Sequence, residues 1–149
     1  MLNFNKNYFL HVKIFTGTVM VVNKNFIQNK SKSFTISNSL KISISTNYHS
    51  GETYSYVWGG SKTININPKN ISGISYRGDG WFDEWTAVSF NGWSTYQYAS
   101  NSKTLSSNEV NTVKNLITNN SLHIRVGAID YFGSETHAQG VVYITFTYN

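Results

Sequence analysis

Apolar and polar residues alternate over short runs along most of the chain. Near the start, Leu10, Val12 and Ile14 fall on one face of such a run, and His11 and Lys13 fall on the other. A period of two is the pattern of a β-strand that buries one face. The same alternation returns in the runs 34–36, 40–44, 54–58, 64–66, 122–128 and 142–148. The chain is therefore predicted to be all-β.

Turn residues separate these runs, at Thr16-Gly17, 49–51, Gly59-Gly60, 68–70 and Asn91-Gly92. The strongest signal is Asn91-Gly92, because both central residues of a two-residue hairpin turn adopt positive φ. It predicts a hairpin of strands 85–90 and 93–98. Short strands at this spacing favour an antiparallel β-sandwich of jelly-roll type.

Residues 1–149 are expected to form one sandwich domain, because no repeat is visible and no linker divides the chain. The first part of the chain, residues 1–32, is open to two interpretations. It completes the sandwich as a strand pair, or it reaches onto a neighbouring subunit as an arm. The polar, Lys-rich segment 24–33 is where such an arm would separate from the core.

One segment departs from the alternation. Four apolar residues from Val110 to Ile117 recur at helical spacing, and Ser106 with Glu109 forms a capping-box pattern. These features predict a short amphipathic helix over residues 107–118, just before the closing hairpin. Its apolar face should lie across an edge or end of the sandwich.

Composition narrows the class of partner. Aromatic residues make up 15% of the 149 residues and charged residues 13%, which is typical of a folded domain and not of a disordered chain. The net charge is +5, but the lysines are scattered, and only Arg77 and Arg125 are arginines. Nucleic-acid-binding proteins concentrate such charge on one face, so no nucleic-acid partner is expected.

The N-terminal apolar run predicts neither a signal peptide nor a membrane span. His11 and Lys13 interrupt it, and no small-residue cleavage site follows. The sequence also contains no cysteine, which excludes disulfides and thiolate metal ligands. Because neither a signal peptide nor a membrane span is predicted, we expect no membrane partner.

The order of elements in the second half of the chain resembles a known group of modules. A Trp-rich segment, 76–93, leads to the helical segment. An alternating strand with Ile124–Ala128 follows, and then a last strand, Val142–Tyr148, ends in an aromatic residue. This order is similar to that of small jelly-roll modules in bacteriophage virion proteins such as tail, fibre and capsid-decoration components.

The resemblance implies a non-enzymatic structural or attachment protein of a bacteriophage particle, without a cofactor. It implies partners that are other copies of the chain and other virion proteins. It further implies a protein assembled in the host cytoplasm and released in the virion by lysis.

Aromatic residues are the best candidates for a ligand-binding or interface surface. The Trp-rich segment is interpreted as a turn followed by a hairpin, with Trp85 and Trp93 packing inward and Trp81 and Phe82 available for contact. Trp58, in an earlier strand, is also expected to pack inward. The candidate residues are Trp81, Phe82, Trp93, Tyr96, Tyr98, Tyr131 and Phe132. Since Trp and Tyr also stack on sugar rings, the alternative function is a carbohydrate-binding module or receptor-binding domain that recognises a host surface glycan.

Other candidate chemistry is weaker. Asp79, Asp83 and Glu84 are candidate ligands for a hard cation, although a solvated acidic turn is the favoured interpretation. The tripeptide Arg77-Gly78-Asp79 is interpreted as part of a tight turn and not as an adhesive motif. The four histidines have no metal-ligand spacing, and His49 and His137 are assigned to loops. A hydrolase is the third and weakest candidate, so the protein is predicted not to be an enzyme.

Overall fold

The computed structural model describes residues 11–15, 18–22, 38–51, 56–131 and 135–149. By its internal contacts the chain divides into two compact units, Met1–Ser37 and Asn38–Asn149. The first unit contains an antiparallel pair of strands, β1 (His11–Phe15) and β2 (Thr18–Val22). Phe34 and Ile36, expected in a strand, lie outside the described residues.

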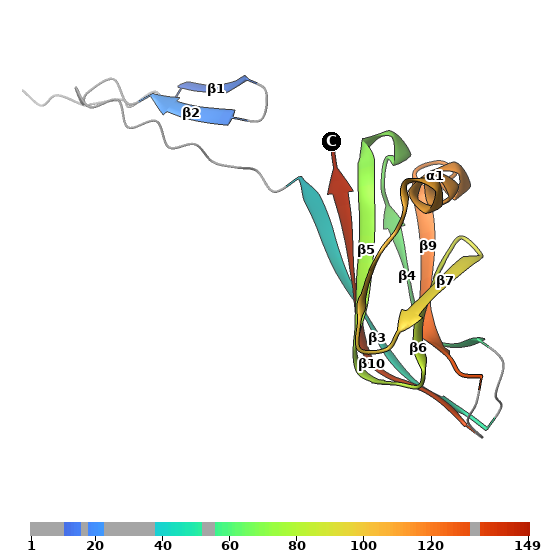
Figure 1. Ribbon diagram of the computed structural model, residues 1–149. Helices are drawn as coiled ribbons and strands as arrows, with labels where there is room; N and C mark the ends of the chain where they lie inside the picture. The colour runs from blue at the N-terminus through green and yellow to red at the C-terminus, as the bar shows by residue number, and fades with distance from the viewer. Residues whose placement is uncertain (1–10, 16–17, 23–37, 52–55, 132–134) are drawn as a thin grey trace, which may run out of the picture. The chain divides into compact units, whose positions relative to one another are not determined.

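The second unit is an antiparallel β-sandwich of two four-stranded sheets (Figure 1). The first sheet has the order β3-β10-β5-β8 and consists of β3 (Ser39–Ser50), β10 (Thr136–Tyr148), β5 (Ile71–Phe82) and β8 (Ser102–Thr104). The second has the order β4-β9-β6-β7 and consists of β4 (Tyr56–Asn65), β9 (Ser121–Ile129), β6 (Trp85–Phe90) and β7 (Trp93–Tyr98). The predicted all-β sandwich is confirmed.

Strand pairing in this unit is nested. β6 pairs with β7, β5 with β8, β4 with β9, and β3 with β10, so the strands of this unit are arranged as one long hairpin wrapped into two sheets. The tip of this hairpin is the predicted turn, where Asn91 has φ 47° and Gly92 has φ 95°. Both values lie in the left-handed region that Asn and Gly tolerate best.

The core lies between the inner faces of the two sheets. Phe146 of β10 and Phe90 of β6 are fully buried, and their rings meet edge to face at 6.3 Å. Along β10 the inward residues Val142, Ile144 and Phe146 alternate with outward residues, as the period of two predicts. Outward side chains therefore determine what each sheet offers to a partner.

The predicted helix is present as α1 (Ser107–Leu116), which contacts β5 and the short 3₁₀ helix η1 (Pro68–Asn70). Its capping box forms as expected, because Ser106 Oγ accepts from the backbone N–H of Glu109, and a Glu109 carboxylate oxygen accepts from the Ser106 N–H at 2.8 Å.

No helix in the part of the chain that the structure describes combines the length and the apolar character needed to cross a bilayer.

Two predicted turns are wrong. Gly59-Gly60 lies inside β4, at a bulge, and a side chain at Gly60 would collide with the backbone of Ser45. Arg77-Gly78-Asp79 lies in the middle of β5, paired with residues of β10. Gly60 permits the close approach of a neighbouring backbone, and Gly78 leaves room for the side chains of Thr86 and Phe82. Close packing within a strand therefore explains these glycines without a turn.

Candidate functional site

Six aromatic side chains gather on the outer face of the sheet β4-β9-β6-β7, and we call them the aromatic surface. They come from β4, β6, β7 and the residues after β9: Tyr56, Trp58, Trp85, Tyr96, Tyr98 and Tyr131. The register forms two adjacent rows across the sheet, Trp58–Gly127–Ala87–Tyr96 and Tyr56–Ile129–Trp85–Tyr98. Side chains within a row project to the same side of the sheet.

The rings of the aromatic surface contact one another. Trp85 is central, with ring centroids 5.1 Å from Tyr131, 5.5 Å from Tyr96 and 6.4 Å from Tyr98. Tyr56 stacks on Trp58 at 5.3 Å. Tyr98 is the most exposed of these six residues, at 56%.

The phenols of the surface also influence one another. Burial raises the pKa of Tyr56, and the neighbouring hydroxyls of Tyr131 and Tyr96 raise it further. The three phenols therefore lie close enough to interact, although they come from β4, from the end of β9 and from β7. With its pKa raised above the ordinary value of 10.0, Tyr56 is a neutral hydrogen-bonding group at physiological pH.

Arg125 of β9 separates two hollows at the border of this surface. Its guanidinium lies over the Trp58 ring, 4.7 Å from the centroid. One hollow, of about 320 Å³, is lined by Trp58, Gly59, Gly60, Ser61 and Arg125. The other, of about 530 Å³, extends from Arg125 past His123 to the tip of the β6–β7 hairpin. Arg125 thus connects the aromatic surface with a polar region.

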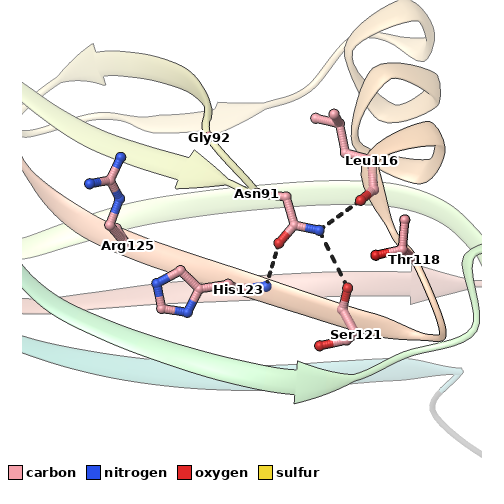
Figure 2. Close-up of a pocket in the computed structure, with 7 residues that line it drawn as sticks. All are labelled: Asn91, Gly92, Leu116, Thr118, Ser121, His123 and Arg125. Atoms are coloured by element: carbon pink, nitrogen blue, oxygen red, sulfur yellow. Dashed lines mark hydrogen bonds between the residues drawn. The ribbon is translucent and has the colours of Figure 1, made fainter.

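Asn91 organises the larger hollow (Figure 2). Its side-chain amide donates to the carbonyl of Leu116 at 2.7 Å and to that of Ser121 at 3.3 Å, and its oxygen accepts from the backbone N–H of His123 at 2.8 Å. The hairpin tip is thereby fixed to the end of α1 and to β9. The hollow has a preformed wall, which is usual for ligand sites.

The structure divides the aromatic residues that the sequence grouped together. Tyr96, Tyr98 and Tyr131 belong to the aromatic surface, whereas Trp81 lies on the outer face of the other sheet, 55% exposed. β5 and β6 follow each other in the chain but belong to different sheets, which separates Trp81 from Tyr96 and Tyr98.

Other assignments are corrected. Phe82 was expected at the surface but is buried, at 5% exposed, because it points inward from β5. Trp93, a candidate contact residue, packs against the core beside Phe90, as its inward assignment predicted. Trp85 and Trp58 were expected inside and are outward-facing. Phe132 lies outside the described residues.

Tyr56, Trp58 and Arg125 were not among the residues predicted for the site. Alternation did place Tyr56 and Trp58 on one face of their strand, but it could not show that this face is the outer one. For Arg125, the available signal was its position in a strand whose other face is apolar.

The three acidic candidates do not converge. Among the described residues, Asp79, Asp83 and Glu84 do not form a group with metal-binding distances. Asp83 accepts from the Trp81 ring N–H and from both backbone and ring nitrogens of His137, and Glu84 accepts from the backbone N–H of Tyr131. Asp83 and Glu84 thus hold neighbouring segments together.

Comparison of the chain with protein-family models, with curated proteins and with solved structures found no match.

Proposed function

We propose that the second unit is a carbohydrate-binding module, and that the aromatic surface is its binding site. The observation that carries this proposal is the set of adjacent, partly exposed Tyr and Trp rings on the outer face of one sheet. Ring faces stack on the apolar faces of sugars, and short polar groups bind sugar hydroxyls. The activity is binding without catalysis.

The polar residues around the surface support a sugar as the ligand. Ser61 pairs with Arg125 in the register, and Thr63 pairs with His123, to which its hydroxyl is hydrogen-bonded at 3.0 Å. Along β9, the outward positions from His123 to Ile129 span about 20 Å at the usual rise per residue. A surface of this length suits an oligosaccharide of several units better than a single sugar.

The test compares the unmodified chain with Tyr96→Ala and Tyr98→Ala on an array of immobilised bacterial surface polysaccharides and neutral oligosaccharides. Both side chains are exposed, so their truncation leaves the core intact. We expect each change to weaken binding about 10-fold, the equivalent of about 1.4 kcal/mol of lost stacking.

Tyr143→Ala is the matched control, since Tyr143 lies on the outer face of the other sheet and is 40% exposed, close to the 43% of Tyr96. It should bind as the unmodified chain does. Equal binding by Tyr98→Ala and Tyr143→Ala would show that the aromatic surface is not the site. Absence of binding across the array would refute the proposal as a whole.

A second candidate is a structural or attachment protein of a bacteriophage particle, and the two are compatible, because attachment proteins bind host glycans. The nested strand pairing supports a jelly-roll topology, in which a long hairpin is wrapped into two sheets. The separate unit Met1–Ser37 supports a role in contacting other subunits.

Light scattering of the purified chain tests this second candidate. A defined trimer, pentamer or hexamer is the expected result, since virion components assemble symmetrically. A monomer at every concentration tested would leave the carbohydrate-binding module as the better description.

A further inference from the structure

A compact group of histidine and carboxylate side chains lies on the outer face of the sheet β3-β10-β5-β8, on the other sheet from the aromatic surface. His49 of β3 and His137 of β10 are direct cross-strand partners, so both project to one side. Glu135 lies two residues before His137, and its carboxylate lies close to a ring nitrogen of each histidine. The ligand-type atoms of these three residues all lie within 4.8 Å of one another.

The two distances from the Glu135 carboxylate to the histidine nitrogens are close to those between ligands of one metal ion. His49 Nε2 lies 3.1 Å from Glu135 Oε2, and His137 Nε2 lies 3.7 Å from the same oxygen. Zinc–nitrogen and zinc–oxygen bonds of about 2.0–2.1 Å in tetrahedral geometry place neighbouring ligand atoms about 3.3 Å apart. The two imidazole rings are stacked with their planes 15° apart, so the exposed His49 ring must rotate for its nitrogen to point at the same ion as Nε2 of His137 and the Glu135 carboxylate.

The second ring nitrogen of His137 is already oriented by a carboxylate. Asp83 Oδ2 lies 2.7 Å from His137 Nδ1, the distance of a hydrogen bond that the ring N–H donates. In neutral His137 this leaves the lone pair on Nε2, the atom that faces Glu135. A carboxylate that orients a histidine in this way is the usual outer partner of a metal ligand.

Asp83 itself is fixed by further donors. Its Oδ1 accepts from the Trp81 ring N–H at 2.7 Å, and its Oδ2 also accepts from the backbone N–H of His137 at 2.7 Å. The Trp81 ring in turn stacks on His137 at 3.8 Å, and His49 stacks on His137 at 4.4 Å. Because β10 lies between β3 and β5, the imidazole of His137 is held between these two rings.

Two glycines face each other in the strands that carry this group. Gly80 of β5 and Gly140 of β10 are cross-strand partners with φ 137° and 157°. A Cβ on Gly80 would lie 2.7 Å from Cα of Gly140, so only glycine allows the two strands this approach. Trp81 and His137 lie in these two strands, close to the point where the backbones approach each other.

We propose that His49, Glu135 and His137 bind a divalent transition-metal ion, with Zn²⁺ as the preferred occupant and Asp83 as the positioning residue. Two imidazoles and one carboxylate suit zinc and its neighbours, whereas Ca²⁺ and Mg²⁺ prefer oxygen ligands throughout. The side chains of His49 and Glu135 are 47% and 54% exposed. The fourth coordination position therefore faces solvent, where it holds water or an oxygen of a bound ligand.

The experiment is calorimetric titration of ZnCl₂ into the full chain, freed of any histidine tag. We expect saturable binding of one ion per chain. His49→Ala and Glu135→Gln should abolish it, and neither change touches the core. Asp83→Asn should weaken binding about 10- to 100-fold, the usual effect of losing an outer-shell partner.

His123→Ala is the matched control, because His123 is an exposed histidine on the other sheet and belongs to no such group among the described residues. It should bind Zn²⁺ as the unmodified chain does. Absence of one-to-one binding, or equal binding by His49→Ala and His123→Ala, would overturn the proposal. If His49→Ala and His123→Ala bind equally, His49 is not a specific ligand, and the ion is held by scattered surface histidines.

A spectroscopic readout distinguishes the site from loss of folding. Cu²⁺ bound by His137 lies next to the Trp81 ring and should quench its fluorescence. Trp81→Phe should remove most of the quenching but keep one-to-one Zn²⁺ binding. If Trp81→Phe and the unmodified chain are quenched equally, the ion is bound elsewhere and the assignment is wrong.

Discussion

Asn91 gives the sharpest test of how this sandwich is held together. Replacement by Asp keeps the size of the side chain, its tolerance of positive φ and the oxygen that accepts from the His123 N–H. It replaces the amide donor, which serves the carbonyls of Leu116 and Ser121, with a carboxylate oxygen. The change thus removes two hydrogen bonds and sets a negative charge against two carbonyl groups.

The magnitude follows from these contacts. Each lost neutral hydrogen bond costs about 0.5–1.5 kcal/mol, and leaving partly buried carbonyls without a donor adds to this. The bond to Ser121 is long at 3.3 Å and contributes at the low end. We expect Asn91→Asp to lower the free energy of unfolding by about 2–3 kcal/mol at neutral pH. Part of this loss should be recovered in acid, where the protonated carboxyl can donate to Leu116.

Urea unfolding followed by tryptophan fluorescence is the appropriate assay. All four Trp residues lie in the unit Asn38–Asn149, so the signal reports that unit alone. For a slope of about 1–3 kcal/mol per M, the expected loss lowers the transition midpoint by about 0.7–3 M without changing the slope.

Asn120→Asp is the matched control. Asn120 also has positive φ, 58°, but it is exposed and has no side-chain hydrogen bond in the described structure. Its substitution should change stability by less than about 0.5 kcal/mol. If Asn91→Asp and Asn120→Asp unfold at the same urea concentration, the hydrogen bonds of Asn91 do not stabilise the fold and the reasoning is refuted.

Two further predictions concern Glu109 and Thr86. Burial raises the pKa of Glu109, but hydrogen bonds from the Ser106 N–H and the Lys103 ammonium outweigh it, so the net pKa lies below the ordinary 4.5. The stability that this carboxylate contributes is present above pH 4.5 and is lost as the pH falls through its lowered pKa. Glu109→Gln should therefore flatten the acidic part of a plot of the free energy of unfolding against pH. An unchanged plot would contradict the assignment. The Thr86 hydroxyl is buried without a hydrogen-bond partner among the described residues, so Thr86→Val should raise the urea midpoint by the equivalent of about 1 kcal/mol, whereas a lower midpoint would imply a missed partner.

Local chemistry was sufficient to predict several elements. The β6–β7 hairpin follows from Asn91-Gly92, since few residue pairs accept positive φ at both positions. Helix α1 follows from the capping box of Ser106 and Glu109, which satisfies backbone N–H groups within a few residues of sequence. Such signals depend on residues only a few positions apart, so they can be recognised without knowing the tertiary structure.

Predictions that needed the partner strand failed. His49 and His137 were assigned to loops, yet they face each other across β3 and β10. Arg77-Gly78-Asp79 was assigned to a turn, although it lies inside the long strand β5. Residues that are far apart in sequence and paired in a sheet carry no local mark of the pairing.

The sequence by itself determined the secondary structure class, the hairpin tip, the helix and the two faces of each strand. A period of two states which residues share a face, because successive side chains of a strand point to opposite sides. Only the tertiary structure decided which face is outward and which strands are neighbours. These two facts placed Trp85 with Tyr96 and Tyr98 on one sheet, and Trp81 with His137 on the other, because a sandwich buries one face of each sheet and leaves the other for partners.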